Sequence, residues 1–254
     1  MATTKKLTTG NAAAAIPAGN AIPTMDKNGA VTMVTQAAMQ TAVLGGMTAD
    51  MVMDGVFIVY HQNSTGYVRM VKVHAWPALQ TAGEVADGVA IVEGGRILVV
   101  APTEGSVVWS SAAITTGLAT DVRKTVLQDW DGEAHTATII GKSTANTVTD
   151  TATYAPGFCN LYSRSNANGK GLGAGKWWLP SMGEMFMICA NMLRINYALS
   201  LIDGATQLKA AEYWSSSEYS PSQSWYLDLS DGALGYGNKS AVIRRVRPVS
   251  TYIV

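Results

Sequence analysis

The sequence is short of the residues that bind metal ions, form disulfides or build charged surfaces. It has two cysteines and three histidines in 254 residues, and only 14% of its residues are charged. The 18 basic residues balance the 18 acidic ones, so charge favours neither nucleic acid nor a membrane surface as a partner. His61, His74 and His135 do not stand at metal-ligand spacing. We therefore predict no metal, no cofactor and no nucleic-acid partner.

Long apolar runs are also missing. No stretch approaches the roughly 20 apolar residues that span a bilayer, so we expect no membrane insertion. The apolar piece Ala12–Ile16 is too short for the core of a signal peptide, so we expect a protein that is made in the cytoplasm and not exported by the usual route. Cys159 and Cys189 could pair, or they could stay reduced and buried as in most unexported proteins.

Motifs of catalysis are absent as well. Residues 169–176 (GKGLGAGK) superficially resemble a phosphate-binding loop, but Lys170 stands where a Walker loop needs glycine. Trp177 stands where that loop needs Ser or Thr. No carboxylate pair or Ser/His/Asp grouping stands out along the chain, although a triad assembled from distant residues stays open. We predict that the protein is not an enzyme.

The first 54 residues differ in composition from the rest. Ala, Thr, Gly, Met and Asn dominate them, and the first aromatic residue is Phe57. Val31–Met47 is rich in Ala and Met and predicts a helix that ends at Gly45-Gly46. A helix of small residues buries little area alone, so it needs a neighbour. We predict that residues 1–54 form an oligomerisation or docking segment; a partly disordered leader is the alternative.

From Gly55 the pattern becomes that of an α+β domain, residues 55–254. Apolar and alternating runs predict two hairpins, one from Val56–Tyr60 with Tyr67–Val73 and one from Val89–Val92 with Arg96–Val100. Apolar residues make up 48% of the chain, enough for a substantial core.

Helix signals follow in the second half. We expect a helix from Glu133 to about Gly141 and a short helical piece over Asn196–Ile202. Ser181 and Glu184 form a capping box that starts another helix. Behind this box an apolar stripe at helical spacing is expected to pack in the core. The stripe consists of Met185, Phe186, Cys189, Met192 and Leu193.

Residues 212–249 carry the most informative pattern. Residues 225–230 (WYLDLS) alternate apolar and polar, as a half-buried strand does, and Asp231-Gly232 then predicts a hairpin turn. The three apolar residues should point inward and the three polar ones outward. Tyr and Ser are abundant here, and these are the residues with which antibody paratopes make rigid contacts and adaptable hydrogen bonds. A Ser-rich loop that merely solvates the end of the domain is the alternative.

A family resemblance rests on these residues. Residues 212–249 contain the runs YWSSSEYS, SWYL, DG, GNKS and VRPV, and upstream stand YAPGFCNLY (154–162) and GKWWLPSMGEM (175–185). In this order they resemble C-type-lectin-fold proteins of gut anaerobes and their phages. They are most similar to the variable proteins of diversity-generating retroelements, such as phage tropism determinants. The resemblance is clearest over residues 115–249, thinner over 55–114 and absent before them.

The resemblance implies a C-type-lectin-like fold, with a mainly antiparallel sheet and two helices, and a variable region at 212–249. In such retroelements, the adenines of the template codons are randomised. The resulting codons can encode Ser, Tyr or Asp but neither Trp nor Lys. The resemblance therefore implies that Trp214, Trp225 and Lys239 belong to the scaffold. The expected ligand-binding positions are the exposed residues between them. They are Tyr219, Ser220, Ser222, Ser224, Tyr226, Asp228, Ser230, Ala233, Tyr236, Asn238, Ser240, Ala241 and Ile243.

Three of these positions, Tyr219, Tyr226 and Tyr236, should contribute most as aromatic anchors, although Tyr219 could instead pack beneath Trp214. The arginines of the same stretch are expected to pair with carboxylates and stabilise the fold. These are Arg244, Arg245 and Arg247.

The function implied by the resemblance is that of a phage receptor-binding or tail-tip protein. It would be located in the virion, as a homotrimer, with residues 1–54 contacting other tail proteins and the variable face gripping a host-surface protein or glycan. One alternative is a bacterial surface or pilus-tip adhesin of the same fold. Another is an enzyme on a scaffold like that of formylglycine-generating enzymes, but their catalytic cysteines come late in the domain and this chain has none after Cys189.

Overall fold

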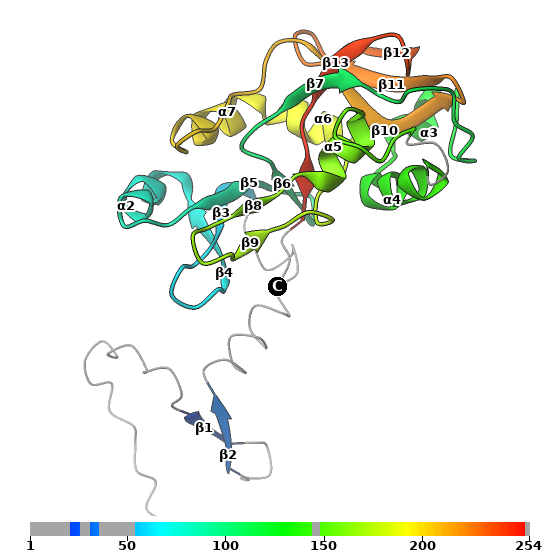
Figure 1. The fold of residues 1–254 in the computed structure, drawn as a ribbon. Helices are drawn as coiled ribbons and strands as arrows, with labels where there is room; N and C mark the ends of the chain where they lie inside the picture. Colours follow the sequence, from blue (N-terminus) through cyan, green and yellow to red (C-terminus); the bar gives the residue numbers. More distant parts are fainter. Residues whose placement is uncertain (1–20, 26–30, 36–53, 144–147, 252–254) are drawn as a thin grey trace, which may run out of the picture. The chain divides into compact units, whose positions relative to one another are not determined.

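The computed structural model describes residues 21–25, 31–35, 54–143 and 148–251. The chain divides into two compact units, residues 1–48 with residue 254, and residues 49–253. In the first unit, β1 (Ala21–Met25) pairs with β2 (Val31–Thr35) in an antiparallel hairpin (Figure 1).

The helix predicted over Val31–Met47 is wrong at its start, because its first five residues form strand β2. Four of these five residues are β-branched, and β-branched side chains favour strands over helices. The remainder, residues 36–47, lies outside the described residues.

The second unit contains two five-stranded sheets. The first sheet is wholly antiparallel, and both predicted hairpins are confirmed in it, β3 with β4 and β5 with β6. Its strands in spatial order are β14 (Val249–Ser250), β6 (Arg96–Val100), β5 (Ala86–Glu93), β3 (Gly55–His61) and β4 (Val68–Lys72).

The second sheet holds most of the stretch 212–249. Its strands in order are β12 (Leu234–Asn238), β11 (Gln223–Asp228), β10 (Glu212–Ser220), β13 (Ile243–Val246) and β7 (Gly105–Val108). All neighbours are antiparallel except β10 and β13, which run parallel. A separate two-stranded hairpin joins β8 (Arg164–Ser165) to β9 (Gly171–Leu172).

Among the described residues there are six α-helices, where the resemblance implies two. They are α2 (Trp76–Thr81), α3 (Arg123–Leu127), α4 (Gly132–Ser143), α5 (Ala155–Leu161), α6 (Met182–Ala190) and α7 (Met192–Ser200). A 3-10 turn, η2 (Val73–Ala75), precedes α2. The predicted helix at 133–141 is confirmed as α4, and the Ser181–Glu184 capping box is formed at the start of α6. In the described part of the chain, no helix has the length and apolar character that crossing a membrane requires.

The prediction of a buried apolar stripe is wrong at its C-terminal end. Met185 is buried, but Leu193 is 88% exposed. The helical phase is lost at Asn191, which ends α6 and precedes α7, so residues beyond it no longer continue the buried face. Residues 192–200 are helical, so the second helical piece starts four residues earlier than the sequence predicts.

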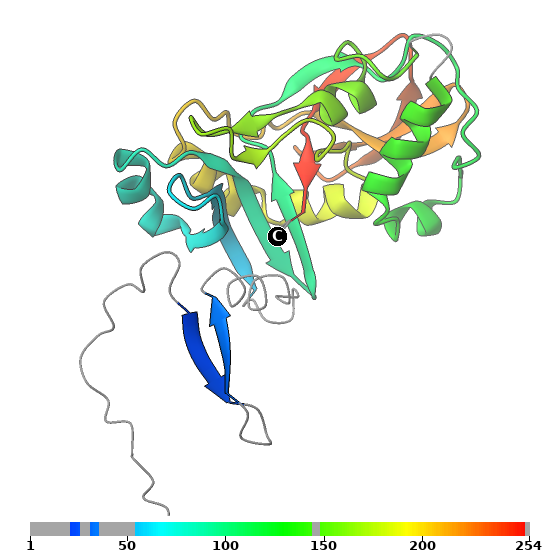
Figure 2. The same ribbon diagram turned by 60° about the horizontal axis from the view of Figure 1, so that its bottom comes forward.

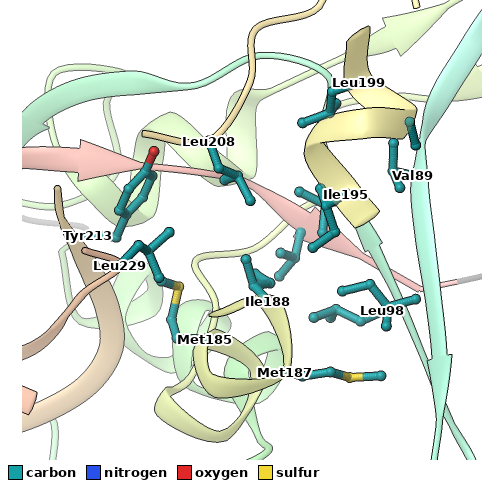
Figure 3. Packing of buried hydrophobic residues seen from close by; sticks show 14 of the residues in the cluster. Val89, Leu98, Met185, Met187, Ile188, Ile195, Leu199, Leu208, Tyr213 and Leu229 are labelled. Atoms are coloured by element: carbon teal, nitrogen blue, oxygen red, sulfur yellow. The ribbon is translucent and has the colours of Figure 1, made fainter. Parts of the chain in front are cut away.

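Helices α6 and α7 are packed between the two sheets. Helix α6 contacts β10 and β11, and α7 contacts β3 and β5. Figure 3 shows side chains of both helices meeting those of β5, β6 and β10 in one core, which has Ile188 and Ile195 near its centre. Seen from a second direction, the two sheets remain distinct layers (Figure 2). The structure is therefore a mixed α+β fold with mainly antiparallel sheets.

Both cysteines are free thiols, so of the two alternatives that the sequence leaves open, a disulfide or reduced cysteines, the structure has the reduced cysteines. Cys159 is fully buried and Cys189 is half-buried. Burial raises the pKa of both thiols, so neither is poised to react as a thiolate.

Candidate functional site

The β11–β12 hairpin presents the residues that the sequence selects for ligand binding. Its register places Trp225 opposite Tyr236 and Tyr226 opposite Gly235. The predicted turn at Asp231-Gly232 joins the strands, and Gly232 has a φ of +77°, a left-handed conformation that favours glycine.

The predicted alternation along β11 is confirmed on its inner side. Trp225 and Leu227 are buried, and Leu229 beyond the strand is 6% exposed. Tyr226 and Asp228 point the other way, but both are only half-buried. The outward side of β11 is therefore partly covered by other parts of the molecule.

Two tyrosines form a stacked pair at the surface. The ring centroids of Tyr219 and Tyr236 lie 3.8 Å apart with an interplanar angle of 10°. Both rings meet Trp225 edge-on, at 5.0 Å and 5.6 Å. Tyr219 thus packs on Trp225 rather than beneath Trp214, and Tyr236 stays 45% exposed. A hydrogen bond between the two hydroxyls raises the pKa of Tyr219.

The platform beneath this pair is rigid. The indole N–H of Trp225 donates to the carbonyl of Thr120 at 2.9 Å, which fixes the ring against the segment that follows β7. The tyrosine pair is therefore held by packing and a hydrogen bond rather than displayed on a free loop.

Tyr226 has a different environment from the other two tyrosines. The Arg244 guanidinium lies 3.8 Å from its ring centroid and 4.3 Å from that of Trp214. Arg244 Nε also donates to Glu212 at 2.7 Å. A Cβ at Gly235 would lie 2.4 Å from the Tyr226 ring, so glycine makes room for this stack. Tyr226 is thus largely part of the scaffold.

Ser224 is buried, which corrects the expectation that it is exposed. Its hydroxyl donates to the carbonyls of Ser217 at 2.9 Å and Ser215 at 3.2 Å. The β10–β11 register shifts between Trp214 and Glu218, as in a β-bulge. Such a bulge leaves backbone carbonyls without strand partners, and the Ser224 hydroxyl satisfies them.

The expected scaffold residue Lys239 is fully buried in an ion pair with Glu218. Its ammonium also lies 4.3 Å from the ring centroid of Trp109 and donates to the carbonyl of Pro221 at 3.2 Å. Burial lowers the pKa of Lys239, and Glu218 opposes that shift. Sequence reasoning did not find Glu218, because no local pattern links residues 21 positions apart.

The three arginines pair with carboxylates, as predicted. Arg244 pairs with Glu212, and both Arg245 and Arg247 pair with Glu104. Glu104 lies outside residues 212–249, so the pairs of Arg245 and Arg247 tie this stretch to the preceding part of the domain.

The remaining candidates lie toward both ends of the hairpin. Ser222, Asn238 and Ser240 gather at one end, where the Lys239 N–H donates to the carbonyl of Ser222 at 3.0 Å. Ser230 and Ala233 lie at the other end, about 17 Å away along the five residues of β12. Exposed candidates are Ser222, Ser230, Ala233, Tyr236, Asn238, Ser240, Ala241 and Ile243; half-buried ones are Tyr219, Ser220, Tyr226 and Asp228.

One group of potential metal ligands lies elsewhere. The side-chain ligand atoms of Asp129, Asp131 and His135 come within 4.8 Å of one another. The Asp129 carboxylate already accepts hydrogen bonds from the Ser217 hydroxyl at 2.5 Å and the Asp131 N–H at 3.1 Å. These bonds account for the position of Asp129 without a metal ion, so we assign none.

Comparison with known proteins adds little to this geometry. No protein-family model and no curated protein sequence matches the chain. A crystal structure of a fimbrial protein from Bacteroides ovatus is similar, with 16% sequence identity and a TM-score of 0.46 over 61% of this chain. The match spans 35% of that protein's length. At this level of similarity we base no argument on the fimbrial protein.

Proposed function

We propose that this chain is a phage receptor-binding or tail-tip protein that attaches to a host-cell surface through the face around the β11–β12 hairpin. In this proposal the domain is a C-type-lectin-like scaffold, as the sequence resemblance implies, and it binds without catalysing a reaction. The observation that carries the proposal is the stacked pair of half-buried Tyr219 and exposed Tyr236 on the buried Trp225.

The chemistry around this pair supports binding to a large ligand. Exposed Ser222, Asn238 and Ser240 offer small polar groups that can adapt their hydrogen bonds to different partners. The frame beneath them is fixed by Trp225 and the buried Lys239–Glu218 pair. A rigid aromatic anchor within adaptable polar contacts suits a protein or glycan ligand, and a homotrimer would raise the strength of attachment through avidity.

The test is cell binding by the purified, fluorescently labelled protein and by virions that carry the same variants. Tyr236→Ala should weaken binding by tenfold or more, because central aromatic anchors contribute about 2 kcal/mol or more in interfaces. Tyr197→Ala is the matched control, because Tyr197 is 59% exposed on α7, away from this face.

A second variant separates lost binding from lost packing. Asn238→Arg adds bulk and charge at an exposed position and removes no buried contact, so it should block binding while the melting temperature is unchanged. Unchanged binding by both Tyr236→Ala and Asn238→Arg would exclude this face as the attachment site.

Diversification of residues 212–249 is tested in the neighbouring DNA. The proposal expects a near-copy of the coding region that differs at adenines, beside a gene for a reverse transcriptase. A locus with neither would exclude diversification of residues 212–249. The binding face would still be tested by the cell-binding experiment.

A further inference from the structure

A cavity of about 310 Å³ lies between strand β6 and the first turns of helices α4 and α6. It shares no residue with the face around the β11–β12 hairpin. Leu98 and Met187, which lie near each other in Figure 3, contribute apolar surface to it. The indole rings of Trp130 and Trp178 also line it. The cavity is thus partly aromatic and large enough for a small organic group.

Carboxylates dominate the charge of this cavity. Asp131, Glu133 and Glu184 line it, against a single basic residue, Arg96. Among the residues that the structure describes, no basic side chain forms an ion pair with any of these three carboxylates. Arg96 is instead placed over the Trp130 ring, 4.3 Å from its centroid.

Among the residues with a described environment, Glu184 differs from the other buried carboxylates. Glu218 pairs with Lys239, Glu104 pairs with Arg247, and Asp87 pairs with His61 at 2.6 Å. Glu184 is 6% exposed, yet it accepts only neutral hydrogen bonds, from the Ser181 N–H at 2.8 Å and the Trp178 indole at 3.2 Å. A buried carboxylate without a cation is costly in its ionised form, and it faces a cavity that could admit one.

We propose that this cavity binds a primary ammonium group, which forms an ion pair with Glu184 and contacts the Trp130 ring. The Arg96–Trp130 contact shows that this ring already accepts a cation on its face, and tryptophan is the best aromatic partner for one. The ammonium group belongs either to a lysine side chain of a partner protein or to a free alkylamine.

The protonation of Glu184 gives the site a characteristic pH dependence. The pKa of Glu184 is raised to about 8, mainly by burial and to a smaller extent by nearby Asp129, so the carboxyl is mostly protonated in the empty cavity at neutral pH. An arriving ammonium favours the ionised form, and the carboxyl proton is released to solvent. Affinity should therefore rise as the pH increases from 6 to 8, by up to about tenfold per unit. The other charged groups around the cavity are Arg96, Asp131 and Glu133.

The test is isothermal titration calorimetry of the full-length protein at pH 8 with n-butylamine and Nα-acetyl-lysine methylamide. Neutral n-butanol is the comparator for apolar contact alone. At least one amine should bind and n-butanol should not. Tighter binding of the lysine derivative indicates a partner protein's lysine, whereas binding of n-butylamine alone indicates a free amine.

Two variants change the affinity in opposite directions. Glu184→Gln removes the charge but keeps the capping box, because glutamine serves at that position too, and it should weaken amine binding more than tenfold. Arg96→Gln removes the competing cation and should strengthen binding several-fold. Asp203→Asn, at an exposed position outside the cavity, is the control and should change nothing.

Two results would overturn the proposal. One is the absence of amine binding to the unmodified protein, and the other is an affinity that both cavity variants leave unchanged. If Glu184→Gln does not fold, Arg96→Gln decides alone, because a gain of affinity cannot result from unfolding.

Discussion

Single residues in this protein show how a buried charge can organise its surroundings. Lys239 has a side chain that is 1% exposed, and its ammonium meets Glu218, the Trp109 ring and the Pro221 carbonyl. Its own backbone carbonyl accepts from Trp109 and Ser110, at 2.9 Å and 3.1 Å. One residue therefore joins the end of β7, the β10–β11 turn and the segment after β12.

We predict that Lys239→Met destabilises the protein by about 3–5 kcal/mol, because it leaves the Glu218 charge buried without a partner. Urea denaturation measures the change. The double variant Lys239→Met/Glu218→Gln should recover part of the loss, since it removes the orphaned charge. Lys209→Met, at an exposed position, should stay within about 0.5 kcal/mol. A Lys239→Met protein as stable as the parent would show that this pair does not hold the scaffold.

At the scale of elements, strand β12 requires glycine at two positions where a side chain would not fit. Gly235 and Gly237 face the Tyr226–Arg244 stack, and a Cβ at Gly237 would lie 2.5 Å from Arg244 Nη1. The strand can lie over the flat faces of an aromatic ring and a guanidinium only because these two positions have no side chain. Neither Gly235 nor Gly237 has a positive φ, so space, rather than backbone conformation, requires glycine here.

We predict that Gly235→Ala destabilises the protein by about 1–3 kcal/mol, because the added methyl group overpacks against Tyr226. The matched control is Gly141→Ala in α4, where the new Cβ would have no neighbour within 4 Å apart from adjacent residues and its own helix backbone. That change should stabilise the protein by about 0.5–1 kcal/mol, the difference between glycine and alanine inside a helix. Thermal and urea denaturation of both variants check the opposite signs. Equal effects would contradict the steric explanation.

Elements with a strong local pattern were predictable from sequence, and short or interrupted ones were not. The hairpins β3–β4, β5–β6 and β11–β12 each have apolar or alternating runs around turn residues. Helices α3 and α5 have only five and seven residues, too few to display a helical period. Strand β2 was predicted as helix, because an apolar run of that length does not by its own period distinguish the two.

At the scale of the whole molecule, the chain contains two compact units, and the larger has its own cores. The main core draws residues from both five-stranded sheets and from α6 and α7, all within residues 49–253. Every described residue of this core therefore belongs to the larger unit itself.

We predict that a chain truncated to residues 49–254 keeps the melting temperature of the full-length protein within a few degrees. If residues 1–54 assemble the protein, as the sequence predicts, removal of residues 1–48 should give a monomer while the full-length chain is a trimer. Differential scanning calorimetry and light scattering after size-exclusion chromatography measure the two properties. A truncated chain that remains a trimer would move the assembly contact into residues 49–254.

The sequence by itself determined what depends on neighbours along the chain. The alternation of Trp225, Leu227 and Leu229, the Asp231-Gly232 turn and the Ser181–Glu184 capping box all act within a few residues, so their patterns can be read directly. The family resemblance, rather than any local pattern, separated the buried Trp214, Trp225 and Lys239 from most of the exposed positions around them.

Only the tertiary structure decided which distant groups meet. Ser224 is buried because a bulge in the neighbouring strand leaves carbonyls for its hydroxyl, and Tyr226 is covered because Arg244 stacks on it. In the described part of the chain no basic side chain forms an ion pair with Glu184, although its sequence context shows only a helix cap. Such pairings depend on the balance between desolvation and contact across separate elements, which no local pattern records.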